Sequence, residues 1–129
     1  MCMKIKLVSV LVNNQDKALK FYTEVLQFVK KTEVPLGEHK WLTVVSPEEQ
    51  DGTEVVLEPI AFEPAKTYQK SLFEAGIPFT AFHVDDIQKE YERLEKSGVK
   101  FSMKPTKMGP VTLAVFDDTC GNNIQIVQV

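Results

Sequence analysis

Two side chains in this sequence have the chemistry of a general acid or base. His83 follows an apolar run, and imidazole is the side chain that gains or loses a proton near neutral pH. Glu58 would become a usable base if it were buried among apolar side chains, although a strand end beside Pro59 equally suits a solvated carboxylate. A lone histidine in a strand is more often structural. The catalytic residues therefore stay unknown, with His83 and Glu58 as candidates.

Other side chains are better suited to binding than to catalysis. Trp41 could stack on a flat ligand or fill the core, and the amide of Gln125 can donate and accept at once. Cys120 follows two acidic residues, which oppose formation of a thiolate nucleophile. The only other cysteine is Cys2, so we expect reduced thiols rather than a disulfide framework.

Length and composition predict one soluble globular domain. The chain has 129 residues, of which 43% are hydrophobic and 26% charged. The formal charge is −3 with Lys and Arg scattered along the chain, so we expect no nucleic acid partner. The apolar stretch at residues 5–12 is too short to cross a membrane. We expect a cytoplasmic protein whose partner is a small molecule.

The elements that must position these residues occur twice. The segment from Leu7 matches the segment from Phe79 at an offset of about 72 residues. In the first half, a strand at residues 4–12 and caps at Asn13 and Asn14 precede a helix at residues 16–27. In the second half, a strand at residues 78–84 and two Asp caps precede a helix that ends at Gly98.

Three short β-rich runs follow each helix. They cover residues 28–34, 40–46 and 53–60 in the first half and 100–104, 111–116 and 123–129 in the second. Helical spacing at residues 63–76 predicts a linker helix between modules of about 4–62 and 77–129. The prediction is one α+β domain, residues 1–129, in which two βαβββ modules form a cupped, open β-barrel.

Three segments carry a resemblance to a known family: VNNQDKALKFYTEVL at residues 12–26, FHVDDIQKEYERLEKSG at 82–98 and VFDDTCGNNIQIVQ at 115–128. They resemble signature segments of the vicinal oxygen chelate superfamily, which includes glyoxalases, bleomycin-resistance proteins and extradiol dioxygenases. The order and duplication of these segments cover nearly the whole chain. This sequence departs from the family pattern at three places. Asn13-Asn14 replaces the usual acidic pair, Gln27 replaces the usual Gly, and Thr119 stands where Pro is common.

The resemblance also places the metal ligands of related enzymes. Carried over by position, they fall on Leu7, about Val56, Phe79 and Gln125, and three of these four side chains cannot coordinate an ion. An enzyme site needs roughly three N or O donors. A slipped alignment would offer Glu54 or Glu58 as a second donor. We therefore expect no metal cofactor, and the resemblance disfavours a divalent ion without excluding it.

Strand alternation predicts the lining of the cup, because every second residue shares a face. On the first strands of the two halves these residues are Leu7, Ser9 and Leu11, and Phe79, Ala81 and His83. On the other strands we expect Trp41, Thr43, Glu58, Gln125 and Val127 to point into the cup. The predicted ligand-binding residues are Leu7, Ser9, Trp41, Val56, Phe79, His83 and Gln125.

The leading hypothesis is a glyoxalase/bleomycin-resistance-type protein that binds a small, largely apolar molecule in this cup without the family metal. The alternative is a metal-dependent lyase, isomerase or dioxygenase-like enzyme, similar to lactoylglutathione lyase, with a shifted site at His83, Glu58 and Gln125. A third possibility is a binding module whose cup is filled by its own side chains. The resemblance also implies a homodimer.

Overall fold

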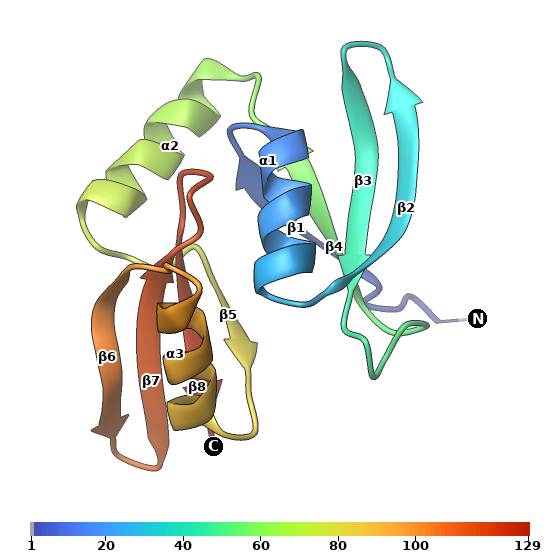
Figure 1. Ribbon diagram of the computed structural model, residues 1–129. Coiled ribbons are helices and arrows are strands. Elements are labelled where there is room, and N and C mark those ends of the chain that lie inside the picture. Colours follow the sequence, from blue (N-terminus) through green and yellow to red (C-terminus); the bar gives the residue numbers. More distant parts are fainter. Residues whose placement is uncertain (1) are drawn as a thin grey trace. The chain divides into compact units, whose positions relative to one another are not determined.

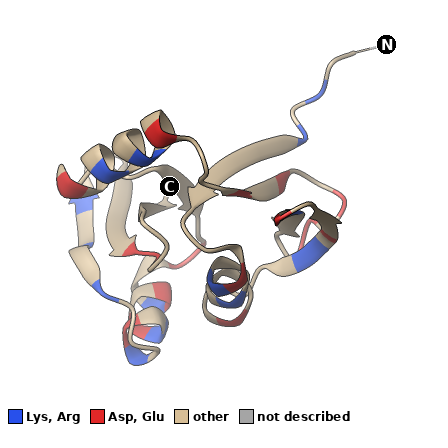
Figure 2. Cartoon of the chain, turned by 90° about the horizontal axis from the view of Figure 1, so that it is seen from above, with Lys and Arg blue, Asp and Glu red and all other residues tan. Residues whose placement is uncertain are grey.

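The computed structural model describes residues 2–129, and its contacts group into two compact units, Met1–Ala61 and Phe62–Val129. Each unit has a four-stranded sheet with a helix against it (Figure 1). Among residues 2–129, no helix has both the length and the apolar character needed to cross a bilayer. Acidic and basic residues are interspersed along the helices rather than separated by sign (Figure 2).

The first unit has the order strand, helix and three strands. Its elements are β1 (Leu7–Val12), α1 (Gln15–Lys20) continuing as the π-helix η1 (Phe21–Val25), β2 (Val29–Leu36), β3 (His39–Val45) and β4 (Glu54–Pro59). The sheet order is β1-β4-β3-β2, with β1 parallel to β4 and the other pairs antiparallel. We call this the first sheet.

One face of the first sheet packs against α1 and η1. Alternate residues of β1, β3 and β4 form this buried layer under Ala18 and Tyr22, and they are Val10, Val12, Leu42, Val44 and Leu57. The predicted cap is present, because Asn14 Oδ1 accepts the Lys17 N–H at 3.0 Å. The helical segment stops before Gln27, which has a φ of 68° in the left-handed region that glycine usually occupies.

The second unit repeats this order after one additional helix. Its elements are α2 (Glu63–Glu74), β5 (Thr80–His83), α3 (Ile87–Lys96), β6 (Phe101–Met108), β7 (Val111–Asp117) and β8 (Asn123–Gln128). The order of this second sheet is β5-β8-β7-β6, with β5 parallel to β8. Asp86 caps α3 by accepting the Lys89 N–H at 3.1 Å, as the sequence predicts.

The helix predicted as a linker, α2, belongs to the second unit and packs on its last turn. Gln69 of α2 is buried, and its Nε2 donates to Asn122 Oδ1 at 3.1 Å and to Cys120 O at 3.4 Å. Asp118 holds the same turn through the N–H groups of Cys120 and Asn122, at 2.7 and 3.0 Å. A Cβ at Gly121 would lie 2.8 Å from the Gln69 side chain, so only glycine allows this contact. The buried Asp118 and Asn122 are thus explained by the turn.

The α+β class and the duplicated βαβββ order are confirmed, while several boundaries differ from the prediction. β1 starts at Leu7 instead of residue 4, although Lys6 O still accepts the Glu54 N–H at 2.7 Å. β5 starts at Thr80 instead of residue 78. The first predicted helix divides into an α-helical and a π-helical part, a change of hydrogen bonding that its apolar spacing does not reveal.

Candidate functional site

The face of the first sheet that points away from α1 carries most of the predicted site residues of the first unit. The pairing register places Ser9 beside Val56, and Val56 beside Thr43, with their side chains on the same side. Alternation along the strands then defines what we call the open face, which includes Leu7, Ser9, Leu11, Thr32, Val34, Leu36, His39, Trp41, Thr43, Glu54, Val56 and Glu58.

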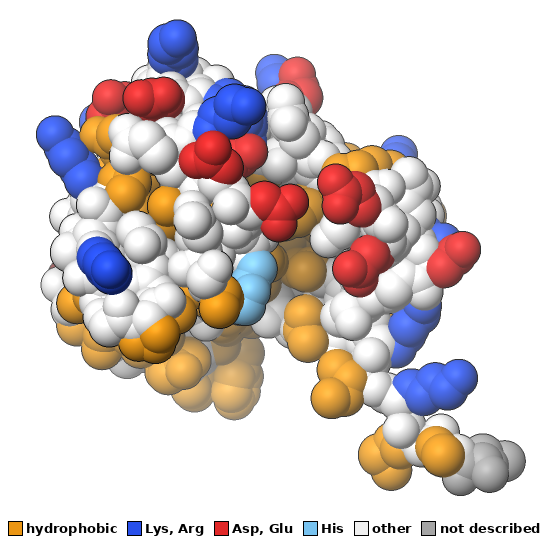
Figure 3. All heavy atoms as spheres, turned by 90° about the horizontal axis from the view of Figure 1, so that it is seen from below, with side chains coloured by type: hydrophobic (Ala, Val, Ile, Leu, Met, Phe, Trp, Pro, Cys, Tyr) orange, Lys and Arg blue, Asp and Glu red, His pale blue; other side chains and the backbone are white. Residues whose placement is uncertain are grey.

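Apolar side chains on the open face remain accessible. Leu7 is 48% exposed and Val34 is 47% exposed, while Leu11 and Trp41 are half-buried. Val56 is buried between β1 and β3, at 3% exposure. Hydrophobic side chains reach the surface in several places in the space-filling view (Figure 3). A sheet face of this kind offers apolar contact area to a ligand.

Two hydroxyl–carboxylate pairs are the polar points of the open face. Ser9 Oγ donates to Glu58 Oε1 at 3.0 Å, and Thr43 Oγ1 donates to Glu54 Oε1 at 2.8 Å. Both carboxylates are half-buried. Glu58 is therefore neither a solvated strand end nor a buried isolated base, the two situations that its sequence position left open.

Lys30 and Lys40 lie on the opposite face, with α1. Lys40 Nζ is 2.7 Å from Asp16 Oδ1 and 2.8 Å from Glu33 Oε2, and Lys30 Nζ is 2.8 Å from Glu33 Oε1. Hydrogen bonds from Lys30 and then Lys40 lower the pKa of Glu33 from 4.5 to about 2. Bonds to Asp16 and Glu33 raise the pKa of Lys40.

In the second unit, His83 and Gln125 lie on one face of the second sheet, on the side away from α3. The register pairs Ala81 with Gln125 and His83 with Val127. His83 is exposed and Gln125 is half-buried. Phe79 immediately precedes β5, and its ring meets Tyr68 of α2 edge-on with 6.3 Å between centroids. Packing against α2 therefore accounts for Phe79 without a ligand.

The structure thus brings the predicted site residues together in two groups, one in each unit. The first unit holds Leu7, Ser9, Trp41, Val56 and Glu58 on its open face, and the second holds His83 and Gln125 on one sheet face with Phe79 beside β5. A role of these residues in ligand binding or catalysis stays a prediction.

The side chains at the family's metal-ligand positions do not fit a metal ion. Leu7, Val56 and Phe79 have no donor atom, and the register places Val56 itself on the open face. Its neighbours Glu54 and Glu58 share that face, where each accepts a hydroxyl hydrogen bond. Within residues 2–129, no three His, Cys, Asp or Glu side chains gather closely enough to hold an ion.

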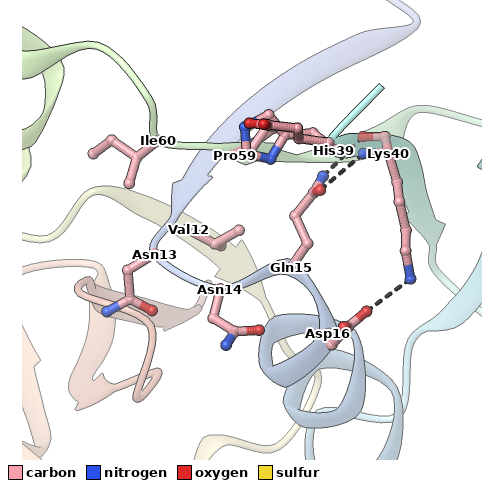
Figure 4. Close-up of a pocket in the computed structure, with 10 residues that line it drawn as sticks. Val12, Asn13, Asn14, Gln15, Asp16, His39, Lys40, Pro59 and Ile60 are labelled. Atoms are coloured by element: carbon pink, nitrogen blue, oxygen red, sulfur yellow. Dashed lines mark hydrogen bonds and ion pairs between the residues drawn. The ribbon is translucent and has the colours of Figure 1, made fainter. Parts of the chain in front are cut away.

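A separate hollow of about 190 Å³ lies where β1 and β4 end and α1 begins (Figure 4). Gln15 forms one wall: its Nε2 donates to the backbone oxygens of Lys40 and Leu57, both at 2.8 Å, and its Oε1 accepts the Lys40 N–H at 3.0 Å. The lining residues are Val12, Asn13, Asn14, Gln15, Asp16, Glu38, His39, Lys40, Pro59 and Ile60. Sequence reasoning interpreted the asparagines only as caps and missed this hollow. The available signal was the run of three amides directly after a buried strand.

Comparisons with known proteins agree with this architecture. The model of the Glyoxalase/Bleomycin resistance protein/Dioxygenase superfamily matches residues 4–126. "Uncharacterized protein YurT" of Bacillus subtilis (strain 168) is 60% identical over 126 residues, covering 98% of this chain and 99% of that protein. The crystal structure of UcmS2 is similar with a TM-score of 0.85 and 31% identity, covering 100% of both chains. TnmS3, described as an antibiotic binding protein from Streptomyces sp. CB03234, has a TM-score of 0.75 and 26% identity, covering 98% of this chain and 96% of its own.

Proposed function

Because this chain belongs to the glyoxalase/bleomycin resistance protein/dioxygenase superfamily, we propose that it binds a small, largely apolar molecule without a metal ion. The observation that carries the proposal is the open face, where the accessible Leu7 and the buried Val56 occupy positions of metal ligands and Val34 adds exposed apolar surface. Leu7, Ser9, Trp41 and Val56 contribute from the first unit in this proposal, and Phe79, His83 and Gln125 from the second.

Two further observations support binding over catalysis. Glu58 already accepts a hydrogen bond from Ser9 Oγ, so its carboxylate is oriented for recognition. TnmS3, which is similar over nearly the whole chain, is described as an antibiotic binding protein. One scaffold serves many chemistries, so this likeness supports a class of function and names no ligand.

A thermal-shift screen of aromatic and polycyclic compounds tests the proposal. A ligand at about 100 times its Kd adds about 2.7 kcal/mol to the free energy of unfolding, which raises the Tm by several degrees for a domain of this length. We expect compounds with a flat apolar body to produce this rise. A screen in which only small, strongly polar compounds raise the Tm would contradict the proposal.

Two adjacent residues of β1 supply a matched pair of variants. Leu7 lies on the open face at 48% exposure, and Val8 points to the other side at 43% exposure. We expect Leu7→Gln to weaken binding of the best compound at least about fivefold, because about 1 kcal/mol of apolar contact is lost. Val8→Gln should leave the affinity unchanged. Equal losses of affinity in the two variants would mean that the open face is not part of the binding site.

We further propose that the chain acts as a cytoplasmic homodimer. Each sheet ends in edge strands, β1 and β2 in the first and β5 and β6 in the second, which a second copy could cover. Sedimentation velocity at micromolar concentration should give the dimer mass. A monomer under these conditions would refute the dimer.

A further inference from the structure

Charge is distributed unequally between the two faces of the first sheet. The face that packs against α1 carries Lys30, Glu33 and Lys40. Lys30 pairs with the buried Val44, Glu33 pairs with the buried Leu42, and Lys40 alternates with Leu42 along β3. The residues that the register assigns to the open face include neither Lys nor Arg; their carboxylates are Glu54 and Glu58, and His39 lies two residues before Trp41. A molecule on the open face would therefore meet negative charge beside apolar surface.

Each carboxylate on the open face keeps capacity to bind a ligand. Glu58 accepts Ser9 Oγ at Oε1, and Glu54 accepts Thr43 Oγ1 at Oε1. For neither glutamate does the part of the chain that the structure describes provide a partner at Oε2. The hydroxyls hold the carboxylates in place, and the second oxygen of each can accept a hydrogen bond or face a positive charge.

Glu58 and Trp41 lie at the same end of the open face. β3 and β4 run antiparallel, with Thr43 opposite Val56. Trp41 comes two residues before Thr43 and Glu58 comes two residues after Val56, so both lie toward the same end of the sheet. Glu54 lies four residues back along β4, about 13 Å away in an extended strand. Tryptophan is the aromatic side chain that attracts a cation most strongly over its ring.

We propose that the molecule bound on the open face is an organic cation, an aromatic or apolar amine or quaternary ammonium. Its apolar body lies over Leu11 and Trp41 and extends along β1 toward Leu7, and its positive charge lies beside Glu58. This inference rests on the proposed function and adds to it the charge of the ligand.

Three probes of similar size and different charge test the proposal by isothermal titration at pH 8. N-methylacridinium is a permanent cation, acridine is neutral at this pH, and anthracene-9-carboxylate is an anion. We expect N-methylacridinium to bind about tenfold more tightly than acridine, since a charge-assisted contact replaces a neutral one. Anthracene-9-carboxylate should bind most weakly. Added salt should weaken binding of the cation and leave that of acridine unchanged.

Isosteric variants assign the preference to one carboxylate. Glu58→Gln can still accept the Ser9 hydrogen bond, and it should reduce the ratio of the two affinities to about one. Two control variants should keep the ratio of the cation affinity to the acridine affinity. Glu54→Gln removes the other carboxylate of the open face, and Glu24→Gln removes a carboxylate of η1, which packs against the opposite face. Equal binding of cation and neutral probe, or a preference that survives Glu58→Gln in folded protein, would overturn this inference and leave the proposed function standing. Failure of all three probes to bind would contradict both.

Discussion

Thr119 holds a backbone conformation that β-branched residues rarely adopt. Its φ is 64°, and its N–H donates to Asp117 Oδ1 at 2.7 Å. The family pattern that this sequence resembles has proline at this place, and a proline ring, which fixes φ near −65°, could not occupy this turn.

Replacing Thr119 by glycine should stabilise the protein. Glycine removes a left-handed strain of about 1–2 kcal/mol and costs about 0.5–1 kcal/mol of chain entropy, so we expect a gain of about 0.5–1 kcal/mol in urea unfolding. Thr119→Ala keeps a Cβ at positive φ and should gain much less. A glycine variant less stable than the alanine variant would show that the turn is not strained.

Glu33 should make stability depend on acid pH. Hydrogen bonds from Lys30 and Lys40 lower its pKa from 4.5 to about 2 in the folded chain. A depressed folded pKa stabilises the fold above the unfolded value, and this contribution is lost as the pH falls from about 4.5 to about 2. The pairs are partly solvated, so the effect should shrink in high salt.

The variant Glu33→Gln tests this pH dependence of the free energy of unfolding. It should be less stable than the parent protein at pH 7, and the difference should disappear as the pH approaches 2, as measured by chemical unfolding at a series of pH values. Glu48→Gln, at an exposed turn position, is the control for removal of one negative charge. A difference that is constant with pH would mean that ionisation of Glu33 does not contribute.

At the scale of elements, Gln15 completes the hydrogen bonding where β3 and β4 separate. The antiparallel register between these strands pairs Thr43 with Val56 and Val44 with Val55. Beyond it, the Gln15 amide bonds to Lys40 on one strand and to Leu57 on the other. One side chain of α1 therefore fixes the spacing of the strand ends that carry Trp41 and Glu58.

Gln15→Ala should consequently lower the free energy of unfolding by about 1–3 kcal/mol, because partly buried backbone groups lose their partner. Urea denaturation measures this loss. Gln88→Ala is the control, since Gln88 is an exposed helical residue whose side chain bonds only weakly to Glu92, at 3.4 Å. Similar small losses in both variants would mean that water replaces the amide of Gln15.

Sequence patterns predict elements and faces better than contacts between distant side chains. The duplication, the caps at Asn14 and Asp86 and the helix stop at Gly98 depend on local residues, and all are present. Alternation places Leu7, Ser9, Trp41, Val56 and Glu58 on one face because a strand has a period of two.

The contacts that the sequence does not reveal join residues far apart along the chain. Gln15 reaches Leu57 across 42 positions, and Gln69 reaches Asn122 across 53. Register shifts between Lys30 and Thr32 and the π-helical turn of η1 also depend on tertiary packing. The hollow beside Gln15 results from such contacts, so its lining could not be derived from periodicity.

At the scale of the whole molecule, the two units share one βαβββ plan, whereas the side chains at the metal-ligand positions of the family are apolar at three of four places. We expect dialysis against EDTA to change neither the Tm nor the affinity for the best compound from the screen. Elemental analysis of protein purified without chelator provides the second readout. One tightly held Zn, Ni, Mn or Fe per chain would contradict metal-independent binding.

The most direct test of the binding surface is an NMR titration of the ¹⁵N-labelled protein with the best compound from the screen. We predict that the largest shift changes in the first unit occur at Ser9, Trp41 and Glu58, with the single indole N–H among them. Changes concentrated instead at Asn13, Gln15 and the other residues around the hollow would contradict binding on the open face.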